Sequence, residues 1–310
     1  KKITQTQLFK ITSLNSLSVI LKLFIGLITA KVIAVFVGPS GLALLGNFRN
    51  FVGAFETIST LGFQNGIVKY IAESKEKEAE FKKYISTIFI SVALVSLFLS
   101  GLLFFQADYW NKLIFDSNFK YEFVFKAFAF ALPWHALSLV LVSVLNGFGR
   151  FKNVIYITII GNCIGLIASV WFIYQYQTVG ALLSIIVTPS ILFIVSYYFI
   201  SKEFSVLESV RFHFFDYKII KNLSQYFLMA LVSGIVGAAV FVSIRNNIIV
   251  TVGIQQAGYW EAITRISSYY LLFVSSLLTL YFLPKLAAAK NNQETKDVFW
   301  RYYKNIFPLI

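Results

Sequence analysis

The sequence predicts an all-α membrane protein that crosses the bilayer many times. The 310-residue chain is 58% hydrophobic and only 13% charged, with a mean hydropathy of +0.73. A soluble domain is nearer half apolar and about a quarter charged. Apolar runs of about 20 residues, the length that spans a bilayer as a helix, recur along the chain. These runs are continuous rather than alternating, which excludes a membrane β-barrel.

Eight apolar runs are long enough to span the bilayer and predict eight transmembrane helices. They lie at 11–37, 42–71, 85–106, 123–147, 154–174, 179–200, 223–250 and 257–284. A ninth run begins near 299 and is cut off at Ile310.

The connections between these runs alternate in charge. The turns at 39–41, 175–179 and 251–256 carry no Lys or Arg. Basic residues gather in the opposite set of connections: Lys1, Lys2, Lys10, Lys75, Lys77, Lys82, Lys83, Arg150, Lys152, Lys202, Arg211, Lys218, Lys221, Lys290, Lys296 and Arg301. Because basic loops remain in the cytoplasm, we expect a cytoplasmic N-terminus.

The same loops account for most of the net charge of +13, so we expect no nucleic-acid partner. A single cysteine, Cys163, excludes an internal disulfide and a cysteine metal cluster. The sequence has no Gly-Lys-Ser/Thr phosphate loop and no His/Cys/Asp cluster at metal-ligand spacing. We therefore expect no metal, no cofactor and no enzymatic activity.

An internal repeat divides the chain. Arg49 follows Gly38 by 11 residues, and Arg265 follows Gly253 by 12. Two lysines then follow these arginines by the same 20 residues, Lys69 and Lys285. Both copies start on the cytoplasmic side, which is typical of a parallel repeat about an axis along the membrane normal.

The repeat predicts a two-lobe helix bundle. We expect a six-helix transmembrane lobe at 1–200, a cytoplasmic linker at 201–222 and the first part of a second lobe at 223–310. The linker is either an amphipathic helix at the membrane surface or an ordinary connection.

Among the basic residues inside apolar runs, four lie well within the outer half of the predicted membrane: Lys31, Arg49, Arg245 and Arg265. A charge at that depth costs roughly 2.5–3.5 kcal/mol and normally faces a cavity or a partner. Only two acids lie at comparable depth, Glu56 and Glu261. The predicted cavity is net positive and favours an anionic passenger; phosphate fits the planar fork of Arg and the point charge of Lys.

Three of these cations also have a structural interpretation. Lys31 could extend to the outer interface. Arg265 could pair with Glu261 at i,i+4, and Arg49 could pair with Glu56 to lock two helices.

Further residues are candidates for secondary contacts or for coupling to a proton or monovalent cation: Glu56, Glu261, Lys22 and His135. Carboxylates and histidine in a membrane can carry protons. The two glutamates could instead be counter-ions to arginine, and His135 a hydrogen-bonded packing residue.

Two segments resemble a known family. Residues 41–49 (GLALLGNFR), continuing to 61–71 (LGFQNGIVKYI), are similar to the second span of Wzx-type polysaccharide flippases. Residues 257–265 (AGYWEAITR), continuing to 281–286 (YFLPKL), are similar to their eighth span. Among the members of this family, the chain resembles O-antigen translocases and the enterobacterial common antigen lipid flippases, within the multidrug/oligosaccharidyl-lipid/polysaccharide exporter superfamily. The resemblance covers nearly the whole chain. The chain lacks about the last three helices of the family, so we expect it to be a C-terminally truncated piece of a longer protein.

The resemblance implies two six-helix lobes around a central cavity in the bacterial inner membrane. It implies alternating access that moves undecaprenyl-pyrophosphate-linked oligosaccharide from the cytoplasmic to the periplasmic leaflet for O-antigen and lipopolysaccharide biosynthesis. Expected partners are the membrane lipids, a polysaccharide polymerase and a chain-length regulator. By matching position, Arg49 and Arg265 contact the pyrophosphate, and Lys31 and Arg245 assist.

Two other functions remain open. One is a cation- or proton-coupled drug antiporter of the same superfamily, which would need an acidic cavity. The other is a membrane-embedded polysaccharide polymerase, which would need a large periplasmic loop, whereas the longest predicted outer loop, at 107–122, is short.

Overall fold

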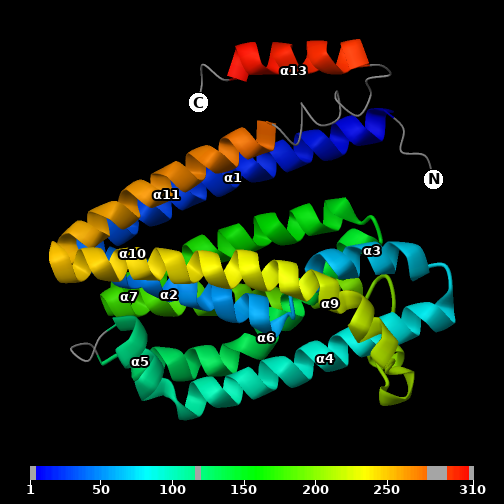
Figure 1. Cartoon of the computed structure of the whole chain (residues 1–310), viewed down its shortest axis with the longest axis horizontal. Helices are drawn as coiled ribbons and strands as arrows, with labels where there is room; N and C mark the ends of the chain where they lie inside the picture. The colour runs from blue at the N-terminus through cyan, green and yellow to red at the C-terminus, as the bar shows by residue number, and fades with distance from the viewer. Residues whose placement is uncertain (1–4, 116–119, 278–291, 307–310) are drawn as a thin grey trace.

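The computed structural model describes residues 5–115, 120–277 and 292–306. The first two ranges form a bundle of long helices (Figure 1). The predicted all-α membrane fold is confirmed. Five helical segments of the described residues are long and apolar enough to cross a membrane: Leu14–Phe36, Glu78–Phe105, Glu122–Gly147, Phe151–Ile200 and Tyr217–Thr251.

The first helices are α1 (Gln5–Phe36), α2 (Gly38–Ser59) and α3 (Gln64–Ser74). The apolar run at 42–71 is not one helix, because Leu61 and Gly62 have φ angles of 53° and 57° between α2 and α3. A left-handed conformation ends an α-helix and is easiest at glycine. The Gly62 backbone also lies against Ala230, where a side chain would collide.

The next helices are α4 (Glu78–Phe105), α5 (Ala107–Phe115) and α6 (Glu122–Gly147). Helix α5 occupies most of the stretch that the sequence predicts as an outer loop. One face of α5 is apolar, and Ala107, Ile114 and Phe115 are buried on it. Burial of this face explains why a helix forms there.

Helix α7 (Phe151–Ile200) contains the predicted spans 154–174 and 179–200, separated by a kink at Gln177 with φ 48°. Its two halves pack against each other in opposite directions. A Cβ at Gly165 would lie 2.8 Å from Thr188, and one at Gly161 would lie 2.7 Å from Leu192. Small residues therefore allow the close approach of the two halves.

The segment 201–222 is not a single amphipathic helix. It contains the short helix α8 (Val206–Ser209), the 3-10 turn η1 (Phe212–Phe214) and the start of α9. The segment is tied to α4, since the Ser86 hydroxyl donates to the Ser209 carbonyl at 2.8 Å and the Asp216 amide donates to the Thr87 hydroxyl at 3.0 Å. The domain boundary placed at this segment stays a prediction.

The chain continues through α9 (Tyr217–Leu231), the π-helical turn η2 (Val232–Val236), α10 (Gly237–Thr251), α11 (Ile254–Leu277) and α13 (Asn292–Ile306). Helix α13 begins before the predicted ninth apolar run and carries charged residues through its length. The end of the predicted span 257–284, together with Lys285, lies outside the described residues.

Helix α11 returns along α1 and packs on both α1 and α2 (Figure 1). Two glycines allow this contact. A Cβ at Gly26 would lie 2.7 Å from the ring of Tyr269, and a Cβ at Gly258 would collide with the carbonyl of Pro39. The second copy of the repeat therefore contacts the first directly.

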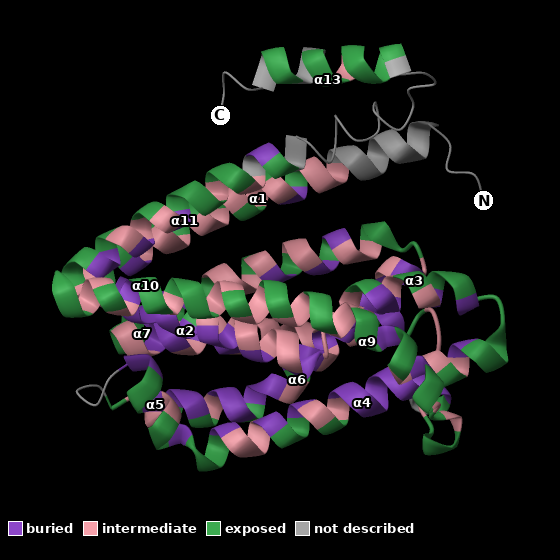
Figure 2. Cartoon of the chain, viewed as in Figure 1, coloured by how far each residue is buried: buried purple, intermediate pink, exposed green. Residues whose placement is uncertain are grey.

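The buried core follows α2, α4 and α6 (Figure 2). One cluster is built on the packed rings of Phe48, Phe51, Phe125 and Phe128. Large apolar side chains are exposed on the outside of the bundle, among them Phe24, Val35, Phe105 and Phe130. In a bilayer these side chains contact acyl chains, which fits a multi-pass membrane protein.

Candidate functional site: an arginine cluster around one glutamate

A buried carboxylate on α11, Glu261, is the centre of a charged cluster. It accepts a hydrogen bond from Nη2 of Arg245 at 2.5 Å and another from Nε of Arg265 at 3.2 Å. Nη1 of Arg49 lies 3.9 Å from its Oε1. Three guanidinium groups from α2, α10 and α11 thus share one carboxylate.

The local structure explains how these groups meet. Glu261 and Arg265 are four residues apart on α11, so both lie on one helix face. Gly46 lets α2 approach that face. A Cβ at Gly46 would lie 2.6 Å from Cδ of Glu261 and 2.7 Å from Cζ of Arg245. No side chain fits at position 46 while the cluster is assembled.

Arg245 is the most buried of the three arginines, with 1% exposure. Its Nη1 donates to Oδ1 of Asn47 at 2.7 Å, and its guanidinium lies 5.2 Å from the ring centre of Trp260. Asn47 in turn donates to Oδ1 of Asn246 at 2.8 Å and to the carbonyl of Ile114 at 3.1 Å. Arg245 is therefore held within the protein and links α2, α10 and α11.

Arg49 and Arg265 remain available to a ligand. The side chain of Arg49 is 45% exposed. Nη2 of Arg265 has no hydrogen-bond partner within the described part of the chain. Both face a cavity of about 370 Å³ between α2, α10 and α11, which we call the arginine cavity. Its lining residues are Arg49, Asn50, Phe241, Arg245, Glu261, Thr264, Arg265, Ser268 and Tyr269.

Charge is unbalanced at this cavity. One carboxylate faces three guanidinium groups, which leaves a formal excess of two positive charges. Charges away from water are costly unless they are paired and hydrogen-bonded. An anion with several oxygens fits the unpaired N–H groups, and arginine binds phosphate through two parallel hydrogen bonds. The arrangement can therefore hold a phosphate or pyrophosphate.

The structure brings together only part of the predicted ring of four cations. Lys31 is exposed on α1 and lines neither the arginine cavity nor the second cavity described below. Depth in the membrane places Lys31 level with the arginines but does not determine which face of α1 it occupies. A contact between Lys31 and a substrate stays a prediction.

Glu56 does not pair with Arg49. Its Oε2 lies 3.5 Å from Nε2 of His135 on α6 instead. His135 is 6% exposed, and its Nδ1 has no hydrogen-bond partner among the described residues. Two of the four candidates for ion coupling, Glu56 and His135, thus lie side by side.

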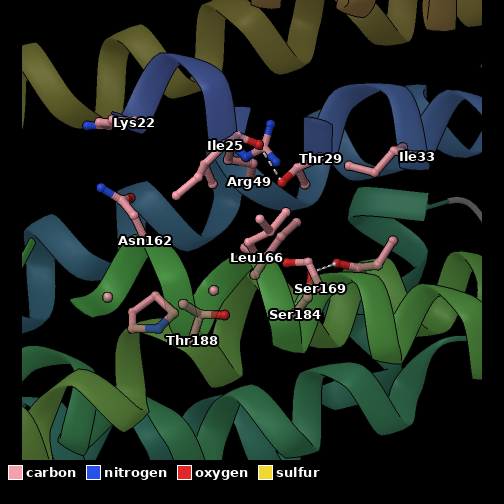
Figure 3. Close-up of a pocket in the computed structure, with 15 residues that line it drawn as sticks. Lys22, Ile25, Thr29, Ile33, Arg49, Asn162, Leu166, Ser169, Ser184 and Thr188 are labelled. Carbon is pink, nitrogen blue, oxygen red and sulfur yellow. Dashed lines mark hydrogen bonds between the residues drawn. The ribbon is translucent and has the colours of Figure 1, made fainter. Parts of the chain in front are cut away.

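Lys22 lines a second cavity, of about 490 Å³, between α1, α2 and the two halves of α7 (Figure 3). Arg49 lines this cavity as well as the arginine cavity. Within the described residues no group of three or more His, Cys, Asp or Glu side chains is placed to hold a metal ion.

Sequence reasoning missed Gly46, Asn47 and Trp260. An asparagine inside an apolar run was a usable signal for Asn47, because buried amides need hydrogen-bond partners. Nothing in the sequence indicates that Gly46 faces Glu261, since the two residues are 215 positions apart.

Comparison with known proteins gives a family and a fold. A family model described as polysaccharide biosynthesis protein matches residues 8–289. The lipid III flippase of Escherichia coli (strain K12) is 23% identical over 296 residues, which cover 94% of this chain and 70% of that relative.

Two solved structures share the fold. The MATE multidrug transporter DinF-BH matches with a TM-score of 0.69 at 13% identity, over 90% of this chain. The chain spans only 64% of the length of DinF-BH. An inward-facing multidrug resistance MATE family transporter of the MOP superfamily matches with a TM-score of 0.67 at 17% identity, over 94% of this chain and 71% of that one. At these identities the likeness concerns the fold alone.

Proposed function

Since the chain belongs to the polysaccharide biosynthesis protein family, we propose that it is a flippase for a saccharide carried on a lipid pyrophosphate. The resemblance seen in the two arginine-bearing segments agrees with this family. The passenger is an undecaprenyl-pyrophosphate-linked oligosaccharide of O-antigen or related surface polysaccharide. It moves from the cytoplasmic to the periplasmic leaflet of the bacterial inner membrane by alternating access, with the N-terminus of the protein in the cytoplasm.

One observation supports the proposal above all others: three arginines meet at one glutamate beside a cavity within apolar helices. Arg49 and Arg265 contact the pyrophosphate, because they carry the exposed or unpaired N–H groups. Arg245 acts as a positioning residue through Asn47 and Glu261. The polyprenyl tail stays in the lipid.

Ion coupling is assigned to a separate pair of residues on α2 and α6. Glu56 and His135 form the pair that takes up and releases a proton or binds a monovalent cation. The polysaccharide polymerase and the chain-length regulator are the partners that receive the flipped saccharide.

A flipping assay tests the proposal. The protein is reconstituted in proteoliposomes with a fluorescent undecaprenyl-pyrophosphate disaccharide, and dithionite quenching reports transfer between leaflets. We expect Arg49→Ala and Arg265→Ala to abolish transfer. Arg49→Lys and Arg265→Lys should recover part of it, because the charge remains but the bidentate fork is lost.

Lys82→Ala is the control, since Lys82 forms an exposed ion pair with Glu78 outside both cavities. It should transfer lipid at the wild-type rate. Wild-type transfer in both alanine variants would rule out the proposed role of the arginines.

A second candidate is a cation- or proton-coupled drug antiporter, which the shared fold with MATE transporters favours. The excess positive charge of the arginine cavity argues against a cationic passenger, because like charges repel in a medium of low polarity. Transport of a cationic dye by the same proteoliposomes, without transfer of the lipid-linked sugar, would establish this alternative.

A further inference from the structure

The second cavity, between α1, α2 and α7, has the dimensions of a binding site. Its volume of about 490 Å³ lies within the range of roughly 300–1,000 Å³ typical of small-molecule sites. Arg49 lines it from α2, and Figure 3 shows Arg49 reaching toward α1 beside Ile25 and Thr29. Because Arg49 also lines the arginine cavity, one molecule held at this guanidinium can occupy both.

Two residues that line the second cavity each carry a buried polar atom without a partner. Nδ2 of Asn162 and Oγ1 of Thr188 make no hydrogen bond within the described part of the chain. They come from opposite halves of α7 (Figure 3). Buried polar atoms are nearly always hydrogen-bonded, so two such atoms lining one cavity indicate a missing polar ligand.

Other hydroxyl groups on the wall supply acceptors. Oγ1 of Thr29 donates to the carbonyl of Ile25 at 2.9 Å, and Oγ of Ser184 donates to that of Ala181 at 2.8 Å. Each hydroxyl oxygen keeps lone pairs that can accept a further hydrogen bond. The wall thus offers both donors and acceptors, and no acid is among its lining residues.

Apolar side chains complete the wall, among them Leu166, Ile185 and Pro189. A sugar ring has the matching chemistry. Its hydroxyl and amide groups donate and accept hydrogen bonds, and its C–H face packs against apolar side chains. A second phosphate matches less well, because the uncharged side chains of this wall outnumber its two cations, Lys22 and Arg49.

We propose that the second cavity binds the first sugar ring of the passenger, next to the phosphate held by Arg49. Asn162 donates to a ring hydroxyl or an N-acetyl carbonyl, and Thr188 exchanges a hydrogen bond with a neighbouring hydroxyl. This inference rests on the proposed function, and it assigns the recognition of the saccharide to α7 rather than to the arginine cluster.

Binding to two lipids tests the inference. The chain is placed in lipid nanodiscs and titrated with bare undecaprenyl pyrophosphate or with undecaprenyl pyrophosphate carrying one N-acetylglucosamine. We expect Asn162→Leu and Thr188→Val to weaken binding of the sugar-bearing lipid by about two- to tenfold, the equivalent of one hydrogen bond each. Binding of the bare lipid should not change.

The controls separate binding from folding. Neither variant should lower the melting temperature of the ligand-free protein, because the removed groups have no partner within the described part of the chain. Thr158→Val makes the same substitution on α7 outside both cavities, where the hydroxyl donates to the Val154 carbonyl, and should leave both affinities unchanged. Arg49→Ala should weaken the binding of both lipids.

The other possible results would contradict either the sugar site or the proposed function. Equal loss for both lipids, or wild-type affinity for the sugar-bearing lipid in both α7 variants, would overturn the sugar site and leave the flippase proposal standing. Failure of the wild-type protein to bind either lipid would overturn the proposed function, and the sugar site with it.

Discussion

At the residue scale, Glu261 is the carboxylate that contacts all three arginines of the cluster. Its two carboxylate oxygens contact Arg49, Arg245 and Arg265, so the protein supplies its own anion to the cluster. This internal anion keeps the guanidinium groups close together despite their mutual repulsion. The phosphate of the proposed passenger would add to this contact or compete with it.

Loss of the Glu261 charge should therefore destabilise the protein. We expect Glu261→Gln to lower the free energy of unfolding by about 3–5 kcal/mol, because Arg245 would be left buried without its counter-ion. Thermal unfolding of the detergent-solubilised protein measures the effect. The control is Asp108→Asn, which breaks an exposed ion pair with Lys112 and should cost no more than about 1 kcal/mol. Equal melting temperatures for the two variants would contradict this account of the cluster.

The sequence identifies individual charges better than it identifies their partners. Arg49 and Arg265 were predictable, because charges inside apolar runs stand out and their spacing repeats. The contact between Glu56 and His135 was not, because it joins α2 to α6 across 79 residues. The position of Lys31 was not predictable either, because the packing of α1 against other helices determines which face of α1 is covered.

At the scale of elements, α2 organises the site. It contributes Arg49 and Asn47, and its glycine at position 46 admits the side chains of α10 and α11. The predicted spans 11–37, 85–106, 123–147, 154–174 and 179–200 each correspond to a helix or to one half of α7. The break at Leu61 and Gly62 and the short helix α5 were missed, because a backbone turn and a buried face depend on contacts with other helices.

A methyl group at Gly46 should disturb the packing of α2 on α11. We expect Gly46→Ala to destabilise the protein by about 1–3 kcal/mol, as overpacking of a filled interior does. Gly53→Ala, on the same helix, adds its methyl group where nothing lies within 4 Å. Because alanine has a higher helix propensity than glycine, the Gly53→Ala control should leave the stability of the protein unchanged or raise it by up to about 1 kcal/mol. Thermal unfolding compares the two, and a more stable Gly46→Ala variant would show that α2 and α11 are not so closely packed.

At the scale of the whole molecule, two of the cavities that the described helices line have one residue in common, Arg49. The helical membrane fold was predictable, since it follows from the length and hydropathy of the apolar runs. The second cavity was not, because it arises where the halves of α7 fold back on each other.

The orientation of the protein in the membrane is testable by labelling. In a Cys163→Ser background, Lys77→Cys and Lys112→Cys each place a thiol on an exposed side chain, on opposite sides of the predicted membrane. We expect a membrane-impermeant maleimide added to intact cells whose outer membrane has been permeabilised to label position 112 and not position 77. Lysed cells provide the control, in which both positions should react. The reverse pattern in intact cells would place the N-terminus in the periplasm.

The π-helical turn at Val232–Val236 sets the direction in which Arg245 points. Such a turn accommodates one residue more than an α-helical turn. One residue corresponds to about 100° of rotation around a helix axis. Everything that follows the turn in α10 is rotated by that angle relative to an uninterrupted helix. Deletion of one residue within Val232–Val236 would rotate the guanidinium of Arg245 to another face of the bundle and separate it from Glu261. The π-helical turn therefore determines the direction of a side chain that lies farther along the helix.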